Sequence, residues 1–383
     1  MNFTLNEDQS ALQSLANQIF QGQVTDEFLL EHDRSGQSFN SELWSLLAEQ
    51  GILGLAIPES CGGSDLGFFE LTLLLQEQGR SVAPVPLLSN LVMAGLPVAA
   101  FGSDDQKRQY LTPLASGQHQ LSAAVAELGM ADAVQTQVLA STQGEGWVLN
   151  GEKHAVPYGQ EASAILVPVI DEDNRCSVFI VDTDAPGVDL QAQRTMLGDS
   201  QSRLLLNNVS VDRSKLLGEI GDGEHILSWI ELRANTALCA IQLGVTEEAL
   251  RRTAEYTCER TQFGRAIGSF QAVGMRAADA FIDIEAIRST LWQAAWRLSE
   301  GLQADAEVRA AKYWACIGGH RVVHTSQHLH GGIGSDLEYP IHRFYLWAKN
   351  TEMSFGATAL QLGKLGQLLA LDDSIGASWL AVS

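Results

Sequence analysis

Residues 146–183 read GWVLNGEKHAVPYGQEASAILVPVIDEDNRCSVFIVDT, and this segment sets the architecture expected for the whole chain. Short runs of Val, Ile and Leu are separated by Gly, Asp, Asn and Pro, a pattern typical of strands rather than helices. Similar runs extend over residues 121–218, so we predict an antiparallel β-domain there. Asn150-Gly151 predicts a hairpin turn, because both residue types tolerate positive φ. Residues 217–223 are predicted to form a loop.

Helical patterns precede this segment. Asn6, with Gln9 three positions later, is a typical helix start. Asn40 is expected to begin a second helix that ends near Gly51. After a glycine-rich break, the run FFELTLLLQEQGR predicts a third helix. We therefore predict an α-helical domain over residues 1–120.

Helical patterns also follow the segment. One apolar stripe at helical spacing consists of Phe281, Ile284, Ile287, Leu291, Ala295 and Leu298. Long helices with such stripes form bundles, which often continue into other subunits. The prediction is an α+β fold with domains at 1–120 (helical), 121–225 (β) and 226–383 (helical bundle).

The charge balance excludes several classes of partner. The 383 residues include 24 Lys and Arg against 46 Asp and Glu, a net charge of −22. Such a surface repels phosphate backbones and anionic lipid, so we expect no nucleic acid partner. An anionic ligand is expected only where the few cationic side chains converge.

Cysteine usage and the termini indicate a cytoplasmic protein. The five cysteines are scattered and form no C-x-x-C pair, a pattern typical of reduced thiols. The first residues, MNFTLNEDQS, are polar, so no signal peptide is predicted. No window offers about 20 uninterrupted apolar residues, so no membrane span is expected.

Two groups of residues near the C-terminus suggest ligand chemistry. His320, His324 and His328 share one helix face, but no companion ligand accompanies them, so no metal site is predicted. The run HGGIG, residues 330–334, is either a helix cap or a turn whose backbone N–H groups approach a phosphate. Arg260 and Arg265 either complement a helix dipole or clamp a pyrophosphate.

The blocks ERTQFGRAIGSFQ, HLHGGIG and EYPIHRFY, with LGLAIPESCGGSDLGFFELTLLLQEQGR near the start, resemble the acyl-CoA dehydrogenase family over essentially the whole chain. The resemblance implies a C-terminal four-helix bundle and FAD-dependent oxidation of an acyl-CoA thioester to the 2-enoyl thioester. It also implies an electron-transfer flavoprotein as electron acceptor. In the family a neighbouring subunit holds the pyrophosphate end of FAD. The corresponding residues here are Arg260, Phe263, Gln271, His328 (in place of a usual Gln), Gly331 and Gly332.

The flavin and substrate side departs from the family pattern. The T-E-P-G-A-G-S-D segment survives only as residues 126–132, and the W-I-T strand is replaced by Ala155-Val156-Pro157. Phe355 occupies the usual position of the catalytic Glu, and Ala234 the alternative one. No catalytic residue is assigned. Glu231 and Glu352 lie nearby in sequence, and we expect both on solvated helix surface.

The losses from the family pattern affect only the residues expected to contact the flavin ring and the substrate. We therefore predict one subunit of a heteromeric enzyme, resembling the bacterial α2β2 dehydrogenases of steroid side-chain CoA esters. Three alternatives remain open. They are a homotetramer whose base is Glu231 or Glu352, a flavin oxidase or monooxygenase, and a non-redox subunit that binds CoA esters.

Overall fold

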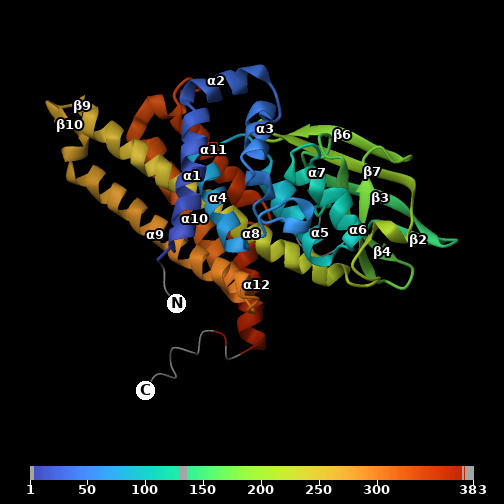
Figure 1. Cartoon of the computed structure of the whole chain (residues 1–383). Coiled ribbons are helices and arrows are strands. Elements are labelled where there is room, and N and C mark those ends of the chain that lie inside the picture. The colour runs from blue at the N-terminus through green and yellow to red at the C-terminus, as the bar shows by residue number, and fades with distance from the viewer. Residues whose placement is uncertain (1–3, 129–135, 373–374, 376–383) are drawn as a thin grey trace. The chain divides into compact units, whose positions relative to one another are not determined.

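The computed structural model describes residues 4–128, 136–372 and 375 of the chain (Figure 1). It forms two compact units, one comprising residues 31–71 and 84–234, the other residues 1–30, 72–83 and 235–383. The α-helices are α1 (Glu7–Gln23), α2 (Asp26–Ser35), α3 (Ser41–Glu49), α4 (Phe68–Ser81), α5 (Leu96–Phe101), α6 (Asp104–Gln106), α7 (Thr112–Ala115), α8 (Gly223–Glu259), α9 (Gln271–Ser299), α10 (Asp305–His330), α11 (Ile341–Met353) and α12 (Thr358–Leu371).

The strands are β1 (Leu121–Ala123), β2 (Leu139–Gln143), β3 (Gly146–Pro157), β4 (Ala164–Asp171), β5 (Cys176–Asp182), β6 (Val188–Arg194), β7 (Ser200–Val211), β8 (Leu216–Leu217), β9 (Thr261–Gln262) and β10 (Arg265–Ala266). The predicted α+β class is confirmed. Domain boundaries at 120 and 225 stay a prediction. In the described part of the chain, no helix is long and apolar enough to cross a membrane.

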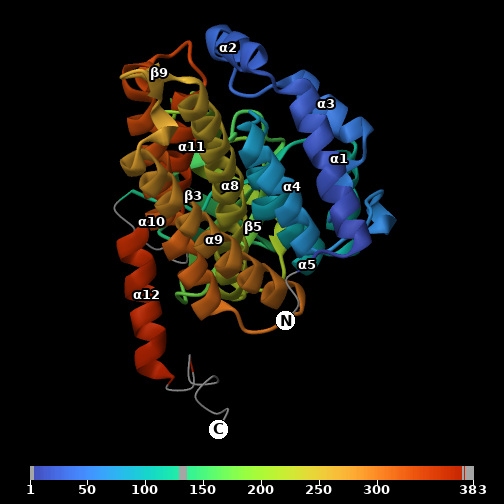
Figure 2. The same cartoon turned by 90° about the vertical axis from the view of Figure 1, so that its left-hand side faces the viewer.

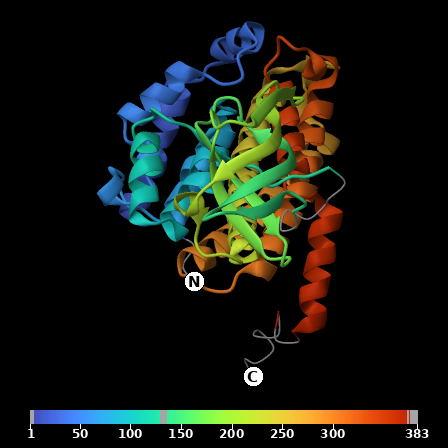
Figure 3. The same ribbon diagram turned by 90° about the vertical axis from the view of Figure 1, so that its right-hand side faces the viewer.

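The first unit contains the large sheet, which faces the viewer in Figure 3. Its strands run in the order β6-β7-β3-β2-β4-β5-β8, and β1 pairs with β4. Most neighbours are antiparallel, as predicted, but β4 pairs in parallel with both β1 and β2. The apolar face of the sheet buries side chains such as Leu149, Val167, Phe179 and Leu204.

The predicted hairpin at Asn150-Gly151 is wrong. Both residues lie inside β3, where the register with β7 shifts between Leu149 and Gly151. The turn between β2 and β3 instead falls after Gln143, where Gly144 has φ +63°. Gly151 has φ +144° at this register shift, which is a β-bulge. The apolar flanks on both sides belong to one long strand, which local sequence cannot distinguish from two short ones.

The second unit contains the long helices α9 and α10, with α11 and the greater part of α8 beside them (Figure 2). Two glycines bring α4 and α8 into backbone contact. A Cβ on Gly79 would lie 2.1 Å from the carbonyl oxygen of Ile241, and one on Gly244 would lie 1.8 Å from that of Gln76. Of the predicted stripe on α9, Phe281 is an exception, because 58% of it is exposed.

A buried ion pair stabilises the β-domain. The Lys153 ammonium is fully buried and donates to Glu127 Oε1 and, at 3.0 Å, to Thr136 Oγ1. Glu127 also accepts from the Gln137 N–H at 2.9 Å. Desolvation works against ionisation of Glu127, but the hydrogen bonds from Lys153, Gln137 and Thr136 outweigh it and lower the pKa. Burial also lowers the pKa of Lys153, so the carboxylate is the more firmly ionised member.

We expect Glu127→Gln to destabilise the chain by about 3–5 kcal/mol, because it leaves the Lys153 charge buried without its partner. Urea unfolding at neutral pH measures the change. Because the folded-state pKa of Glu127 is lowered, its contribution is present above the ordinary pKa of 4.5 and is lost as the pH falls through the lowered value. The difference between variant and wild type should therefore shrink on acidification.

The matched control is Glu152→Gln in β3, next to Lys153, because the Glu152 carboxylate pairs with Arg203 at a side-chain exposure of 41%. Exposed pairs contribute little, so this variant should unfold like wild type. Equal unfolding midpoints for both variants would contradict the importance of the buried pair.

Candidate functional site

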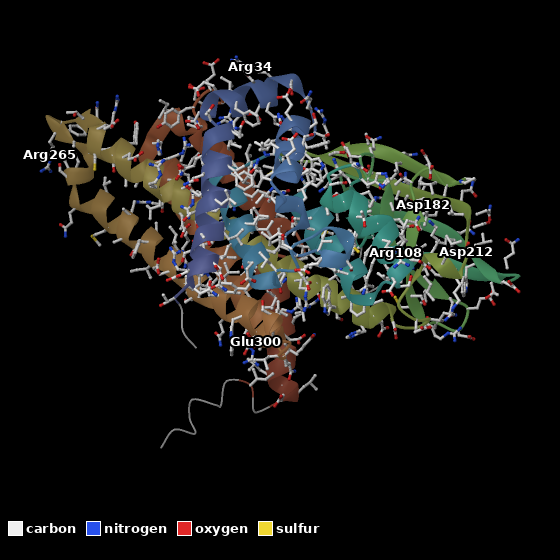
Figure 4. All side chains as sticks on the ribbon, viewed as in Figure 1. Arg34, Arg108, Asp182, Asp212, Arg265 and Glu300 are labelled. Atoms are coloured by element: carbon white, nitrogen blue, oxygen red, sulfur yellow. The ribbon has the colours of Figure 1, made fainter. Side chains whose placement is uncertain are left out.

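The predicted FAD-binding residues begin at a hairpin that connects α8 to α9. Strands β9 and β10 pair through Gln262 with Arg265, and the turn between them holds Phe263 at φ +52° and Gly264 at φ +80°. Phe263 is 93% exposed, although it is a large apolar side chain. Figure 4 places Arg265 at the end of this hairpin, pointing outward. The hairpin therefore presents an aromatic ring and cations to the outside.

Arg260 begins this hairpin with its backbone fixed on both sides. Its N–H donates to the Tyr256 carbonyl at 2.8 Å, and its carbonyl accepts from the Ile267 N–H at 2.8 Å. Its side chain is exposed, and no described carboxylate pairs with it. The Arg265 guanidinium carbon lies 4.0 Å from the centre of the Phe270 ring. Both arginines thus remain available to an external anion.

The glycine turn lies at the end of α10. Gly331 has φ +64°, a conformation that favours glycine, and its N–H donates to the His328 carbonyl. A Cβ on either Gly331 or Gly332 would find no atom within 4 Å. The backbone here is therefore open to a ligand that approaches closely.

Tyr256 connects the hairpin to the glycine turn, a role that no sequence motif indicates. Its ring stacks on His330 with ring centres 4.4 Å apart, and its hydroxyl donates to the His330 carbonyl at 3.4 Å. Since Tyr256 lies one helical turn before Arg260 and His330 directly precedes Gly331, this contact brings the two predicted groups together. The available signal was the helical spacing of four between Tyr256 and Arg260.

The two remaining predicted FAD-binding residues lie next to the hairpin and the glycine turn in the sequence. Gln271 is the first residue of α9, and His328 lies in the last turn of α10; both are exposed. The ring of His324 lies 4.2 Å from that of His320 rather than beside His328. No group of three or more His, Cys, Asp or Glu among the described residues is placed to hold a metal ion.

The turn expected for a catalytic base holds no acid. Phe355 has φ +54° and Gly356 φ +89°. Gln361 Nε2 donates to the carbonyls of both residues, at 2.9 and 3.1 Å, and its Oε1 accepts from Arg309. At the alternative position Ala234 is fully buried. Both candidate positions therefore carry side chains that cannot take a proton.

The expectation that Glu231 and Glu352 lie on solvated helix surface is wrong. Glu231 is only 3% exposed, because α8 packs on this side. The Glu352 side chain is 17% exposed, and its Oε2 accepts from Lys349 Nζ at 2.8 Å. Glu352 is thus neutralised by a lysine, while Glu231 is a buried acid.

The strand expected to contact the flavin is distorted. Ala155 has φ +49°, and its N–H donates to Gln193 Oε1 at 3.2 Å. Pro157, the last residue of β3, has no N–H, and its carbonyl accepts from the Ser122 hydroxyl. Of the segment 126–132, residues 129–132 lie outside the described residues.

Comparison with known proteins identifies the family. Three family models match the chain: the N-terminal domain of acyl-CoA dehydrogenase over residues 6–118, its middle domain over 127–209 and its C-terminal domain over 232–369. The chain belongs to the acyl-CoA dehydrogenase family, and it is therefore an oxidoreductase of the acyl-CoA dehydrogenase type. Members of this family are flavoproteins, and FAD is their cofactor.

Three relatives are especially similar. Acyl-CoA dehydrogenase FadE27 of Mycobacterium tuberculosis is 39% identical over 97% of this chain and 99% of its own length. The structure of the Tcur3481-Tcur3483 steroid ACAD G363A variant matches with a TM-score of 0.88 and 42% identity, over 96% of this chain and 99% of the other. The ChsE4-ChsE5 complex from Mycobacterium tuberculosis matches with a TM-score of 0.91 and 39% identity, over 97% and 100%.

The residues present fit one end of FAD. A pyrophosphate needs cationic donors and close backbone approach. Arg260 supplies an unpaired guanidinium, and the Gly331-Gly332 backbone lies in open space. The residues expected at the flavin ring do not fit in the same way, because Pro157 lacks a donor and Phe355 lacks an acid.

Proposed function

We propose that this chain completes the FAD site of a related catalytic subunit in a heteromeric acyl-CoA dehydrogenase. The complex converts an acyl-CoA thioester to the 2-enoyl-CoA, and this chain has no working site of its own. The observation that carries the proposal is the contrast between two sets of residues. The residues expected to serve a neighbour are exposed, and no described carboxylate pairs with Arg260 among them. Phe355 and Ala234, in contrast, occupy the two positions expected for the base.

The role of this chain in the complex is to bind and orient the cofactor. Arg260 provides the charge that a pyrophosphate needs, and the chain has few such groups, with 24 cationic residues against 46 acidic ones. Gly331 and Gly332 allow backbone approach, and Phe263 covers the cofactor from the hairpin. FAD supplies the hydride acceptor when it is bound. The partner supplies the flavin contacts and the base.

The names of two similar structures support a heteromer and a substrate class. One is a complex of ChsE4 with ChsE5, and the other is the Tcur3481-Tcur3483 steroid ACAD. We infer the same kind of assembly here, an α2β2 heterotetramer, with steroid side-chain CoA esters as substrates. The electron acceptor is an electron-transfer flavoprotein, and the complex is cytoplasmic.

Exposed apolar side chains support assembly with a partner. On α9, Phe281 and Ile282 are 58% and 64% exposed. On α12, Leu362 and Leu369 are 47% and 45% exposed, and Leu371 is 86% exposed. Apolar residues gathered on a surface helix are typical of an interface with another subunit.

Counting flavin against protein mass tests the proposal. The chain expressed alone should contain no FAD, and the complex purified from its native host should contain one FAD per two chains. One FAD in every chain of a homo-oligomer would contradict the proposal and favour a self-sufficient enzyme, with the buried Glu231 as the first candidate base.

Arg260→Ala should weaken FAD binding by the complex at least tenfold. A charge-assisted hydrogen bond to a desolvated pyrophosphate contributes about 1.5–3 kcal/mol, and the variant removes it. Flavin fluorescence on release measures the dissociation constant. Arg213→Ala is the control, because Arg213 is another exposed arginine, which pairs with the exposed Glu219. Equal flavin affinity in both variants would remove Arg260 from the site.

Phe355→Glu should not give the isolated chain dehydrogenase activity. A carboxylate at this turn still lacks a flavin, because the donors expected from the β-domain are absent. Dye reduction with acyl-CoA substrates measures turnover. Activity of this variant without a partner subunit would refute the half-site arrangement.

A further inference from the structure

Arg233, on the α8 segment within the sheet-containing unit, is a half-buried arginine without a carboxylate partner among the described residues. Its guanidinium carbon lies 3.5 Å from the centre of the Trp229 ring and 5.8 Å from that of Phe68. Its one side-chain hydrogen bond in the described structure is a long one, from Nη1 to the Trp229 carbonyl at 3.4 Å. A guanidinium has five N–H donors, so most of them remain available.

Aromatic rings fix the position of this guanidinium. His225, Trp229 and Arg233 are spaced by four residues and share one face of α8. Phe101, the last residue of α5, packs edge-on against both rings of this face, 5.6 Å from His225 and 5.4 Å from Trp229. The Trp229 ring therefore lies against the guanidinium, and Phe101 packs against that ring.

Other half-buried arginines of this chain are paired. Arg80 contacts Glu77 and Glu247, Arg288 contacts Glu247 and Glu285, and both have raised pKa values because these carboxylates outweigh desolvation. Arg233 behaves differently, because burial alone lowers its pKa to about 10. With 46 acidic residues in the chain, a shortage of carboxylates does not explain the missing partner.

We infer that Arg233, held on Trp229, is a binding site for an oxyanion, that is, a phosphate or carboxylate group that accepts two hydrogen bonds from the guanidinium edge. A desolvated cation is costly without a counter-charge, and an external anion provides one. A guanidinium whose face is stacked presents a rigid fork that suits two acceptor oxygens. This site is independent of Arg260 and of FAD. The oxyanion comes either from a free ion or from the phosphate groups of CoA.

Calorimetric titration of the full chain, in complex with its partner, tests this site at constant ionic strength. The probes are inorganic phosphate, acetate, CoA and dephospho-CoA. We expect saturable binding of at least one of them, weakened at least tenfold in Arg233→Gln. Arg233→Lys should recover only part of the affinity, because lysine lacks the planar fork. Each probe identifies a different source of the oxyanion: phosphate a free-ion site, acetate alone a carboxylate site, and CoA alone a site for its phosphate groups. Each result supports the proposal only when Arg233→Gln weakens that binding, because the complex is also expected to bind CoA as part of its substrate.

The control is Arg175→Gln, because Arg175 is an exposed arginine already paired with Asp171 and Asp173. It should bind the probes like wild type. If Arg233→Gln does not fold, two other measurements test whether Arg233 binds the oxyanion. They are the titration of Arg233→Lys and the rise in melting temperature of the wild type and of Arg233→Lys when the probe is added. The proposal is overturned by unchanged affinity in every folded Arg233 variant, or by the absence of saturable binding of all four probes to the wild type.

Discussion

The carboxylate of Glu127 is the constraint on which the β-domain depends. Three donors bind it: the Lys153 ammonium, the Gln137 N–H and the Thr136 hydroxyl. Lys153 also donates to the Thr136 hydroxyl oxygen. Glu127 and Thr136 are nine residues apart in the chain, and both bind Lys153 of β3, so the cluster holds these two positions to that strand.

Several partly buried cations elsewhere in the chain are also paired with carboxylates. In a chain of net charge −22, most half-buried arginines form ion pairs with carboxylates, as Arg80 and Arg288 do. No carboxylate in the described part of the chain pairs with Arg260, which lies where the resemblance to the family expects a pyrophosphate. The same holds for Arg233, although it is partly desolvated. These two cations are therefore the positions at which we propose anionic ligands.

The sequence predicted the helix caps well, but it misplaced the hairpin at Asn150-Gly151 and did not predict the non-local strand pairing. The caps at Asn6 and Asn40 are confirmed, with side-chain hydrogen bonds to Gln9 N and Leu43 N, because a cap depends on a few adjacent residues. Strand β6 was not predicted, since its side chains are mostly polar and exposed and lack the apolar alternation that marks a strand. The parallel pairing of β4 was not predicted either, because it joins segments whose contact no local pattern records.

For the candidate site, the motifs identified the residues but not their surroundings. The exposure of Phe263 and the openness around Gly331 depend on the packed structure. The burial of Glu231 was missed because a helix residue's environment is set by the elements that cover it. Tyr256 was missed for a similar reason, since its importance comes from stacking on His330, which lies 74 residues away in the chain.

The glycine contact between α4 and α8 also restricts the evolution of the chain. At Gly79 and Gly244 each helix meets a backbone carbonyl of the other, so even alanine at one site forces the helices apart. No compensating change to a smaller residue exists, because glycine is already the smallest. A side chain at either glycine can therefore be accommodated only if the backbone of the facing helix moves.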